Sequence, residues 1–253
     1  IKKEYGTKRL TAIENAEEAV YEEKKMEEME VVFLMDRFGY MKLLDKTVYE
    51  RNKEAANAEN KYVFTCMNTD KICIFTDLGR MHTVKAVDIP LGRFRDKGTP
   101  ADNLSNYNMS EEQMLYVAPM ADVSSSNLLF VSETSMCKLV EGAEFDVAKR
   151  TIAATKLAEN DKLIFVGRAD EMEHVVLQSK GGYFLRFLKQ EIPVKKKGAI
   201  GVRGMKLTGT DTLEHAYLLE NHQEYLIEYH EKQYALNKVK LAKRDTKGTK
   251  PRI

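Results

Sequence analysis

The chain has 253 residues, a formal net charge of +1, and 43% hydrophobic residues. This length fits one large domain or one array of repeats, and the apolar content is enough for a buried core. No run of eighteen apolar residues occurs, so no membrane-spanning helix is expected. Because the chain opens at Ile1 without a charged and apolar leader, we expect no signal peptide and a fragment of a longer protein.

The cysteines and histidines give no sign of a metal site. Cys66, Cys73 and Cys137 are odd in number and lack C-x-x-C spacing, so reduced core thiols and a cytosolic location are expected. The five histidines (His82, His174, His215, His222 and His230) lack the spacing of a zinc helix and are interpreted as surface or strand residues.

The first element in chain order is a helix over residues 9–29. Thr11 and Glu14 have the spacing of a capping box, and six glutamates follow with a thin apolar stripe. We therefore expect residues 1–30 to be a helical lead-in that packs against something outside this chain. Residues 31–253 would form the second domain.

From residue 31 onward, an apolar run, a turn and a basic return strand recur five times. The turns of the clearest copies contain Gly39 and Gly79, and the turns recur roughly every 40–55 residues, the period of a four-stranded propeller blade. The absence of Trp disfavours a WD-repeat propeller. The predicted fold class is all-β, a five-bladed propeller-like disc, with blades at about 31–67, 71–118, 127–167, 174–219 and 224–253. Residues 99–113 are expected to be a polar insertion in the second blade.

A basic segment follows the return strand and often ends in Lys-Gly. It comprises residues 93–99 in the second blade, 195–201 in the fourth and 243–250 in the fifth, while the third keeps only Lys149, Arg150 and Thr151 and the first has Glu50-Arg51-Asn52-Lys53. Equivalent loops of rotated blades lie on one rim, so these loops predict a curved positive track for a polyanion. The plainer alternative is a set of solvated loops.

Charge is also distributed unevenly along the chain. Residues 1–60 carry about −3, residues 61–179 about −4, and residues 180–253 about +8. Such asymmetry is typical of a face that binds a polyanion, although surface charges can also fall unevenly without function.

These features resemble a known family, the C-terminal β-pinwheel of the A subunit of bacterial type IIA topoisomerases (gyrase and topoisomerase IV). Residues 5–11 resemble the family segment Y-G-D-x-R-R-T, and Phe75-Thr76-Asp77-Leu78-Gly79-Arg80 with Val84-Lys85 resembles the blade signature F-x-T-x-x-G-x-x-h-x-h-K. The Lys-Gly loops occupy the blade positions where members of the family meet DNA. The resemblance covers essentially the whole chain.

The chain departs from the family in three places. Gyrase has a Q-x-x-x-G-K-G box in its first blade, whereas residues 50–57 here contain no glycine, so the chain is more similar to topoisomerase IV. Ser135 stands where glycine is usual in the third turn. The fifth repeat stops at Ile253, so its blade would be incomplete or completed by another segment.

The resemblance implies a domain that binds and bends or wraps duplex DNA without sequence specificity. The catalytic tyrosine, the metal-binding acids and the ATPase would lie outside this chain, which would itself need no cofactor, although the parent enzyme would use ATP and magnesium. The implied partners are DNA, the breakage-reunion core and the ATPase subunit. No membrane is expected, and the chain would be a monomer in the bacterial cytoplasm near the nucleoid.

Twenty basic residues are candidate DNA contacts: Arg80, Lys85, Arg93, Arg95, Lys97, Lys138, Lys149, Arg150, Arg186, Lys189, Lys195, Lys196, Lys197, Arg203, Lys238, Lys240, Lys243, Arg244, Lys247 and Lys250. Tyr40, Tyr183 and Tyr234 recur after the turns and are interpreted as packing residues rather than base-stacking platforms.

Two other functions remain open from the sequence. The array could be a protein-interaction disc that binds no nucleic acid, or a propeller enzyme with a central polar site. No P-loop is present, Ser124-Ser125-Ser126 lacks the glycines of a nucleophile elbow, and no pair of carboxylates stands out as catalytic.

Overall fold

The computed structural model describes residues 27–221 and 223–251. The described part is built of antiparallel strands with a few short helices, so the predicted all-β class is confirmed. The helix predicted at 9–29 lies outside the described residues, apart from 27–29, which are not helical. Within the described part, no helix is long and apolar enough to cross a membrane.

Five sheets follow one another along the chain. Three have four strands, in the orders β3-β1-β2-β6, β10-β5-β4-β7 and β11-β8-β9-β14; the fourth sheet is β13-β12-β15 and the fifth is β16-β17. The strands are β1 (Glu30–Asp36), β2 (Tyr40–Asp45), β3 (Asn60–Met67), β4 (Lys71–Thr76), β5 (Arg80–Lys85), β6 (Thr99–Pro100), β7 (Met114–Pro119), β8 (Asn127–Ser132), β9 (Met136–Glu141), β10 (Thr151–Ala153), β11 (Leu163–Arg168), β12 (His174–Ser179), β13 (Phe184–Leu188), β14 (Val202–Arg203), β15 (Leu213–Leu219), β16 (Leu226–Tyr229) and β17 (Lys232–Ala235).

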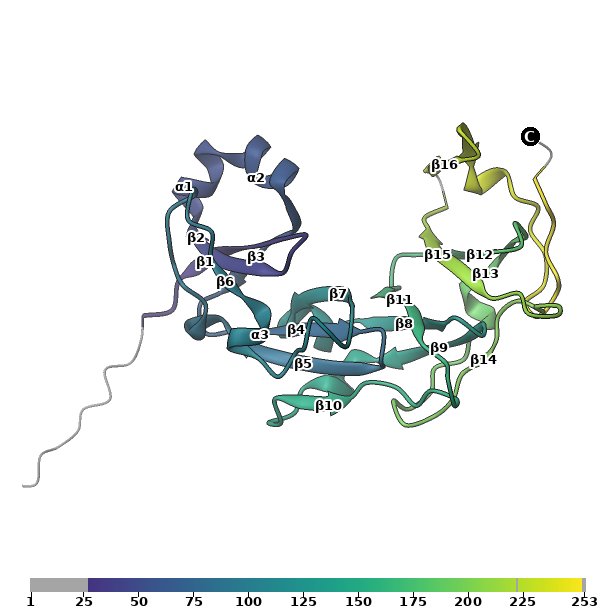
Figure 1. Ribbon diagram of the computed structural model, residues 1–253, viewed down its shortest axis with the longest axis horizontal. Coiled ribbons are helices and arrows are strands. Elements are labelled where there is room, and N and C mark those ends of the chain that lie inside the picture. The colour runs from purple at the N-terminus through teal and green to yellow at the C-terminus, as the bar shows by residue number, and fades with distance from the viewer. Residues whose placement is uncertain (1–26, 222, 252–253) are drawn as a thin grey trace, which may run out of the picture.

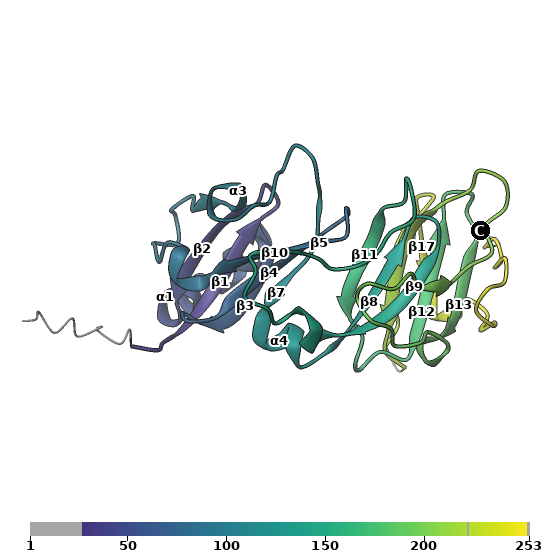
Figure 2. The ribbon, with the colours of Figure 1, turned by 90° about the horizontal axis from the view of Figure 1, so that it is seen from below.

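The sheets form an open arc (Figure 1). Strands β3, β7, β11 and β15 lie on its inner side, and β10 and β14 lie on its outer side. In the first sheet, β6 is the edge strand opposite β3. Figure 2 shows the arc from below, so that the middle of the outer side faces the reader. Short helices join the strands: α1 (Lys46–Arg51), α2 (Lys53–Glu59), α3 (Ala101–Leu104), α4 (Met120–Ser124) and the 3-10 turns η1 (Ala86–Asp88), η2 (Gly142–Phe145), η3 (Lys189–Glu191) and η4 (Leu236–Lys238).

Consecutive repeats exchange their outer strands. After its hairpin β4–β5, the second repeat crosses back and pairs β6 with β2 of the first sheet. In the same way β10 pairs with β5, and β14 pairs with β9. The prediction that each blade is one continuous stretch of sequence is therefore wrong. Residues 99 and 100, predicted to open a polar insertion, are instead the exchanged strand β6.

The central strands are buried on both faces, which explains their continuous apolar runs. Odd and even residues of one strand face different neighbours. In β4, Ile72 and Ile74 pack toward the first sheet with Phe33, whereas Phe75 packs toward the third sheet with Phe130. Alternation of apolar and polar residues is absent from β1, β4, β8 and β12 because both faces of these strands are covered.

Each hairpin turns on a residue with positive φ. Gly39 (81°), Gly79 (70°) and Gly182 (78°) occupy this position in the first, second and fourth hairpins. Ser135 occupies it in the third with φ of 70°. A non-glycine residue pays a conformational cost there, and the buried Ser135 hydroxyl accepts a hydrogen bond from the Met205 backbone N–H at 2.7 Å. This bond ties the turn to the exchanged chain and offsets part of that cost.

Among the described residues, no hairpin precedes the first repeat to receive a strand from it. In place of a crossing segment it carries α1 and α2, which cover the open face of the first sheet through Ala56, Val48 and Tyr49. The residues predicted to be a basic loop, Glu50-Arg51-Asn52-Lys53, therefore lie at the junction of these two helices.

The glycine at the end of the basic segments serves this exchange. A Cβ on Gly98 would lie 2.5 Å from the Met41 carbonyl oxygen, and one on Gly248 would lie 2.6 Å from that of Phe184. Gly201 is crowded by the Cys137 carbonyl in the same way. These three positions need glycine because the exchanged chain passes directly against the neighbouring hairpin.

We expect Gly201→Ala to destabilise the protein by about 2 kcal/mol or more, because the new methyl group overlaps backbone that cannot move away. Gly198→Ala is a matched control three residues earlier, where a Cβ meets nothing within 4 Å, and should be neutral or slightly stabilising. Urea unfolding of both variants measures the difference. Equal stabilities would contradict the proposed close approach.

Candidate nucleic-acid interface

Four segments run from a 3-10 turn to the outer edge of the preceding sheet. In the first three sheets this edge is the exchanged strand, and in the fourth sheet it is β13. We call residues 89–98, 145–150, 192–201 and 239–248 the exchange segments. They follow the outer side of the arc, and the last is the yellow chain at the right of Figure 1. Thr249 forms an isolated bridge with Phe184, so the fourth segment also reaches the preceding hairpin. The structure thus brings the predicted basic loops together on one side.

A buried cation holds the third exchange segment in place. Lys138 on β9 is 2% exposed. Its ammonium donates to the carbonyl oxygens of Lys196, Lys197 and Ala199 at 3.3, 2.7 and 2.7 Å. All three N–H groups of this lysine are therefore used inside the protein. The side chain predicted to meet DNA instead positions the loop that carries other cations.

The same interaction recurs in the neighbouring sheets. Lys42 on β2 donates to the carbonyls of Phe94 and Asp96 at 2.5 and 2.7 Å. Arg186 on β13 donates to the carbonyls of Asn237 and Val239. Lys42 was not among the predicted site residues, although its place between the apolar residues Met41 and Leu43 signals a side chain tied to its own protein.

Burial lowers the pKa of Lys138 to about 8, although Glu144 partly opposes this shift. The ammonium is still largely charged at pH 7, since its pKa lies above that value. A charged group at this depth needs acceptors on every N–H, and the three carbonyls supply them.

The second exchange segment is anchored differently. From its first residue to the residue that pairs with the methionine of the preceding hairpin, the second segment is three residues shorter than the first. His82 of β5 takes the place of the lysine. His82 Nδ1 lies 3.0 Å from the Thr151 hydroxyl, and its Nε2 lies 2.9 Å from Glu112 Oε1. Burial lowers the pKa of His82, and the Glu112 carboxylate opposes this shift.

Several predicted contacts are engaged by acids or carbonyls. Lys189 donates to the carbonyls of Ala169 and Asp170, Lys197 to that of Glu144, and Arg244 to those of Glu191 and Arg203. Ion pairs link Lys196 with Glu144 at 3.4 Å, Lys238 with Glu224 at 3.6 Å, Arg80 with Glu112 at 3.9 Å, and Arg203 with Asp245. These residues contribute less attraction for phosphate than their formal charge suggests.

The remaining predicted cations have no ion pair or hydrogen bond from their charged groups to any residue in the described ranges. Ten are exposed and Lys195 is half-buried: Lys85, Arg93, Arg95, Lys97, Lys149, Arg150, Lys195, Lys240, Lys243, Lys247 and Lys250. All except Lys85 lie on or directly beside the exchange segments.

Two of the recurring tyrosines lie beneath these cations. Lys97 Nζ is 4.2 Å from the centre of the Tyr40 ring, and Lys247 and Lys250 lie 4.7 and 4.9 Å from that of Tyr183. Such stacking orients an ammonium without neutralising it. Tyr234 instead packs edge-on against Phe184.

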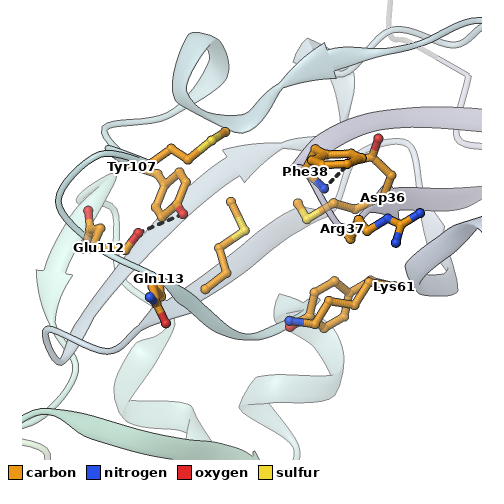
Figure 3. Close-up of a pocket in the computed structure, with 12 residues that line it drawn as sticks. Asp36, Arg37, Phe38, Lys61, Tyr107, Glu112 and Gln113 are labelled. Atoms are coloured by element: carbon orange, nitrogen blue, oxygen red, sulfur yellow. Dashed lines mark hydrogen bonds between the residues drawn. The ribbon is translucent and has the colours of Figure 1, made fainter.

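A cavity of about 300 Å³ lies away from the exchange segments, between the tip of the first hairpin and the connection that precedes β7 (Figure 3). Methionine and aromatic side chains line much of it, and Tyr107 donates to the Glu112 carbonyl at its edge. None of the twenty candidate DNA contacts lines this cavity. Among the described residues, no group of three or more acids, histidines or cysteines is arranged to hold a metal ion.

Comparison with known proteins places this architecture in a family. More than half of the chain, residues 70–107, 126–170 and 173–220, matches the family described as DNA gyrase C-terminal domain, beta-propeller. The chain belongs to this family. The resemblance predicted from the sequence, to C-terminal domains of type IIA topoisomerase A subunits, is thereby confirmed.

Similar curated proteins include the DNA gyrase A subunit of Lawsonia intracellularis, 26% identical over 77% of this chain and 25% of that protein. The corresponding gyrase protein of Clostridium acetobutylicum is 27% identical over 81% of this chain and 26% of its own length. The chain therefore spans about a quarter of these relatives.

Solved structures share the fold. The C-terminal domain of DNA topoisomerase IV aligns with a TM-score of 0.78 at 21% identity, covering 88% of this chain and 72% of that one. The E. coli ParC C-terminal domain aligns at 0.69 and 16% identity, covering 88% and 94%, and a DNA gyrase A C-terminal domain at 0.59 and 18%, covering 87% and 76%.

Replacing Lys138 with Met keeps the apolar stem but removes the donor for three carbonyls. We expect Lys138→Met to lower the free energy of unfolding by about 1–3 kcal/mol. Lys149→Met is the control, because Lys149 is exposed and makes no such bonds; it should change stability by less than about 0.5 kcal/mol. Denaturant titration of both variants is the measurement, and a Lys138→Met protein as stable as the control would refute the anchoring role.

Proposed function

We propose that this chain binds duplex DNA along the outer side of the arc, without sequence specificity, and bends it. The observation that carries the proposal is a set of cations on the exchange segments that no acid among the described residues neutralises: exposed ones on the first, second and fourth segments, and the half-buried Lys195 on the third. Lysine and arginine bind phosphates of any sequence, and binding releases the counterions condensed on DNA.

The spread of the contacts supports bending. Curving a short duplex by tens of degrees costs on the order of 1–6 kcal/mol. One loop could not offset this cost, but several phosphate contacts distributed along an arc can. The buried Lys138 and the half-buried Lys42 and Arg186 fix the segments before DNA arrives, so little conformational entropy is lost on binding.

The parent protein, on this proposal, is a bacterial type IIA topoisomerase A subunit in the cytoplasm. Its breakage-reunion core and the ATPase subunit, with ATP and magnesium, would perform strand passage. This chain would be a monomeric accessory domain that presents bent DNA to the core and has no catalytic part of its own.

Charge reversal tests the outer side directly. We expect Arg93→Glu, Lys149→Glu and Lys243→Glu together to weaken duplex binding strongly, and to reduce the slope of log K against log salt by about 0.9 per lost phosphate contact, or about 2.7 in total. Gel shifts over a salt series measure both quantities.

The control reverses three exposed lysines away from the exchange segments, Lys53 on α2, Lys61 on β3 and Lys232 on β17. It changes the net charge equally but should leave the salt slope unchanged. Identical slopes for the two triple variants would rule out the outer side as the DNA site. Retained binding to a protein partner would then favour the interaction-scaffold alternative.

The first repeat favours bending of the topoisomerase IV kind over gyrase-like wrapping. Residues 50–57, where gyrase carries its glycine-containing box, lie here in α1, α2 and their junction. We expect plasmid relaxed by a type I topoisomerase in the presence of this chain to show almost no change in linking number. A large positive-wrap shift would contradict this assignment while leaving DNA binding intact.

A further inference from the structure

An aliphatic residue occupies the same position of every exchange segment and is exposed in three of them. Each segment begins with a buried apolar residue (Ile89, Phe145, Ile192 or Val239). Two residues later comes Leu91, Val147, Val194 or Leu241. Leu91, Val194 and Leu241 are 54%, 51% and 46% exposed, and Val147 is half-buried.

Isolated exposed apolar residues are normal in proteins, but recurrence at one structural position in three segments is not explained by chance exposure. The position is also fixed. Leu91, Val194 and Leu241 form isolated parallel bridges with Leu43, Leu139 and Arg186 of the preceding hairpins. Their side chains therefore stand at equivalent places along the outer side.

A cation follows each of these residues at the second position: Arg93, Lys149, Lys196 and Lys243. In extended chain, residues two apart point to the same side, and the burial pattern of 91–95 alternates in this way. The first, third and fourth segments thus present an aliphatic group and a cation together on their outward side.

We propose, on the basis of the proposed function, that these aliphatic side chains enter the minor groove of the bound duplex and pack against its deoxyribose edges. A cation bound to a phosphate lies about 7 Å from a side chain two residues away along an extended strand. Because the minor groove is about 6 Å wide between its phosphate walls, that side chain spans the groove and meets the deoxyribose edges of its far wall.

This contact has a thermodynamic signature that phosphate contacts lack. Burying the exposed part of an aliphatic side chain adds affinity without releasing counterions. Removing it should therefore shift the line of log K against log salt without changing its slope.

The experiment compares two triple variants and one double variant of the 253-residue chain for binding to a short linear duplex. We expect Leu91→Ser, Val194→Ser and Leu241→Ser together to weaken binding about tenfold or more at every salt concentration, with the wild-type slope. Arg93→Gln, Lys149→Gln and Lys243→Gln should reduce the slope. Met109→Ser with Leu226→Ser, which removes exposed apolar groups away from the exchange segments, should bind as wild type.

Thermal unfolding confirms that each variant is folded, and netropsin bound beforehand in the minor groove should weaken the wild type more than the aliphatic variant. Wild-type affinity of the aliphatic variant, or equal sensitivity of the two proteins to netropsin, would overturn this inference alone. An unchanged slope in the charge variant would instead overturn the proposed function on which it rests.

Discussion

The arc depends on one constraint: no repeat completes its own sheet. The outer strand of each sheet, where present, comes from the following repeat, and the crossing chain lies so close to the preceding hairpin that Gly98, Gly201 and Gly248 cannot carry a side chain. Ammonium–carbonyl bonds from Lys42 and Lys138 secure the same crossings. Because each of the four exchange segments must pass along the outer side of the arc, the exchange places a polar and cationic loop on that side for each segment.

This arrangement divides the basic residues into two groups with different tasks. Lys138 and Arg186 donate to backbone carbonyls in or beside the exchange segments and hold them in place, whereas Lys189 ties η3 to Ala169 and Asp170. Arg93, Lys149 and Lys243 remain exposed on those segments. Formal charge alone cannot separate the groups, since the difference lies in which carbonyls fold back over each side chain. Rigid loops make the exposed cations more useful, because fewer degrees of freedom are lost when a phosphate binds.

Much of the local structure could be predicted from the sequence. Turn glycines such as Gly39 and Gly79 sit between uninterrupted apolar runs, and both signals are local. The exchange could not be predicted in this way, because pairing β6 with β2 joins residues about sixty positions apart through only two residues. The terminal glycines were therefore interpreted as DNA-facing, whereas they face the neighbouring hairpin. Lys138 offered a local clue, since it stands between the apolar residues Cys137 and Leu139 in a strand buried on both faces.

The uneven placement of exposed cations along the arc bears on why DNA would bend. The five sheets of the described residues provide four exchange segments, because the first repeat carries α1 and α2 in the corresponding place. The segments near the two ends are richest, with Arg93, Arg95 and Lys97 at one end and Lys243 and Lys247 at the other. In the middle, Glu144 engages Lys196 and Lys197. A straight duplex laid across the middle would meet few of these cations, whereas a curved one reaches both ends, so the charge pattern itself favours the bent form.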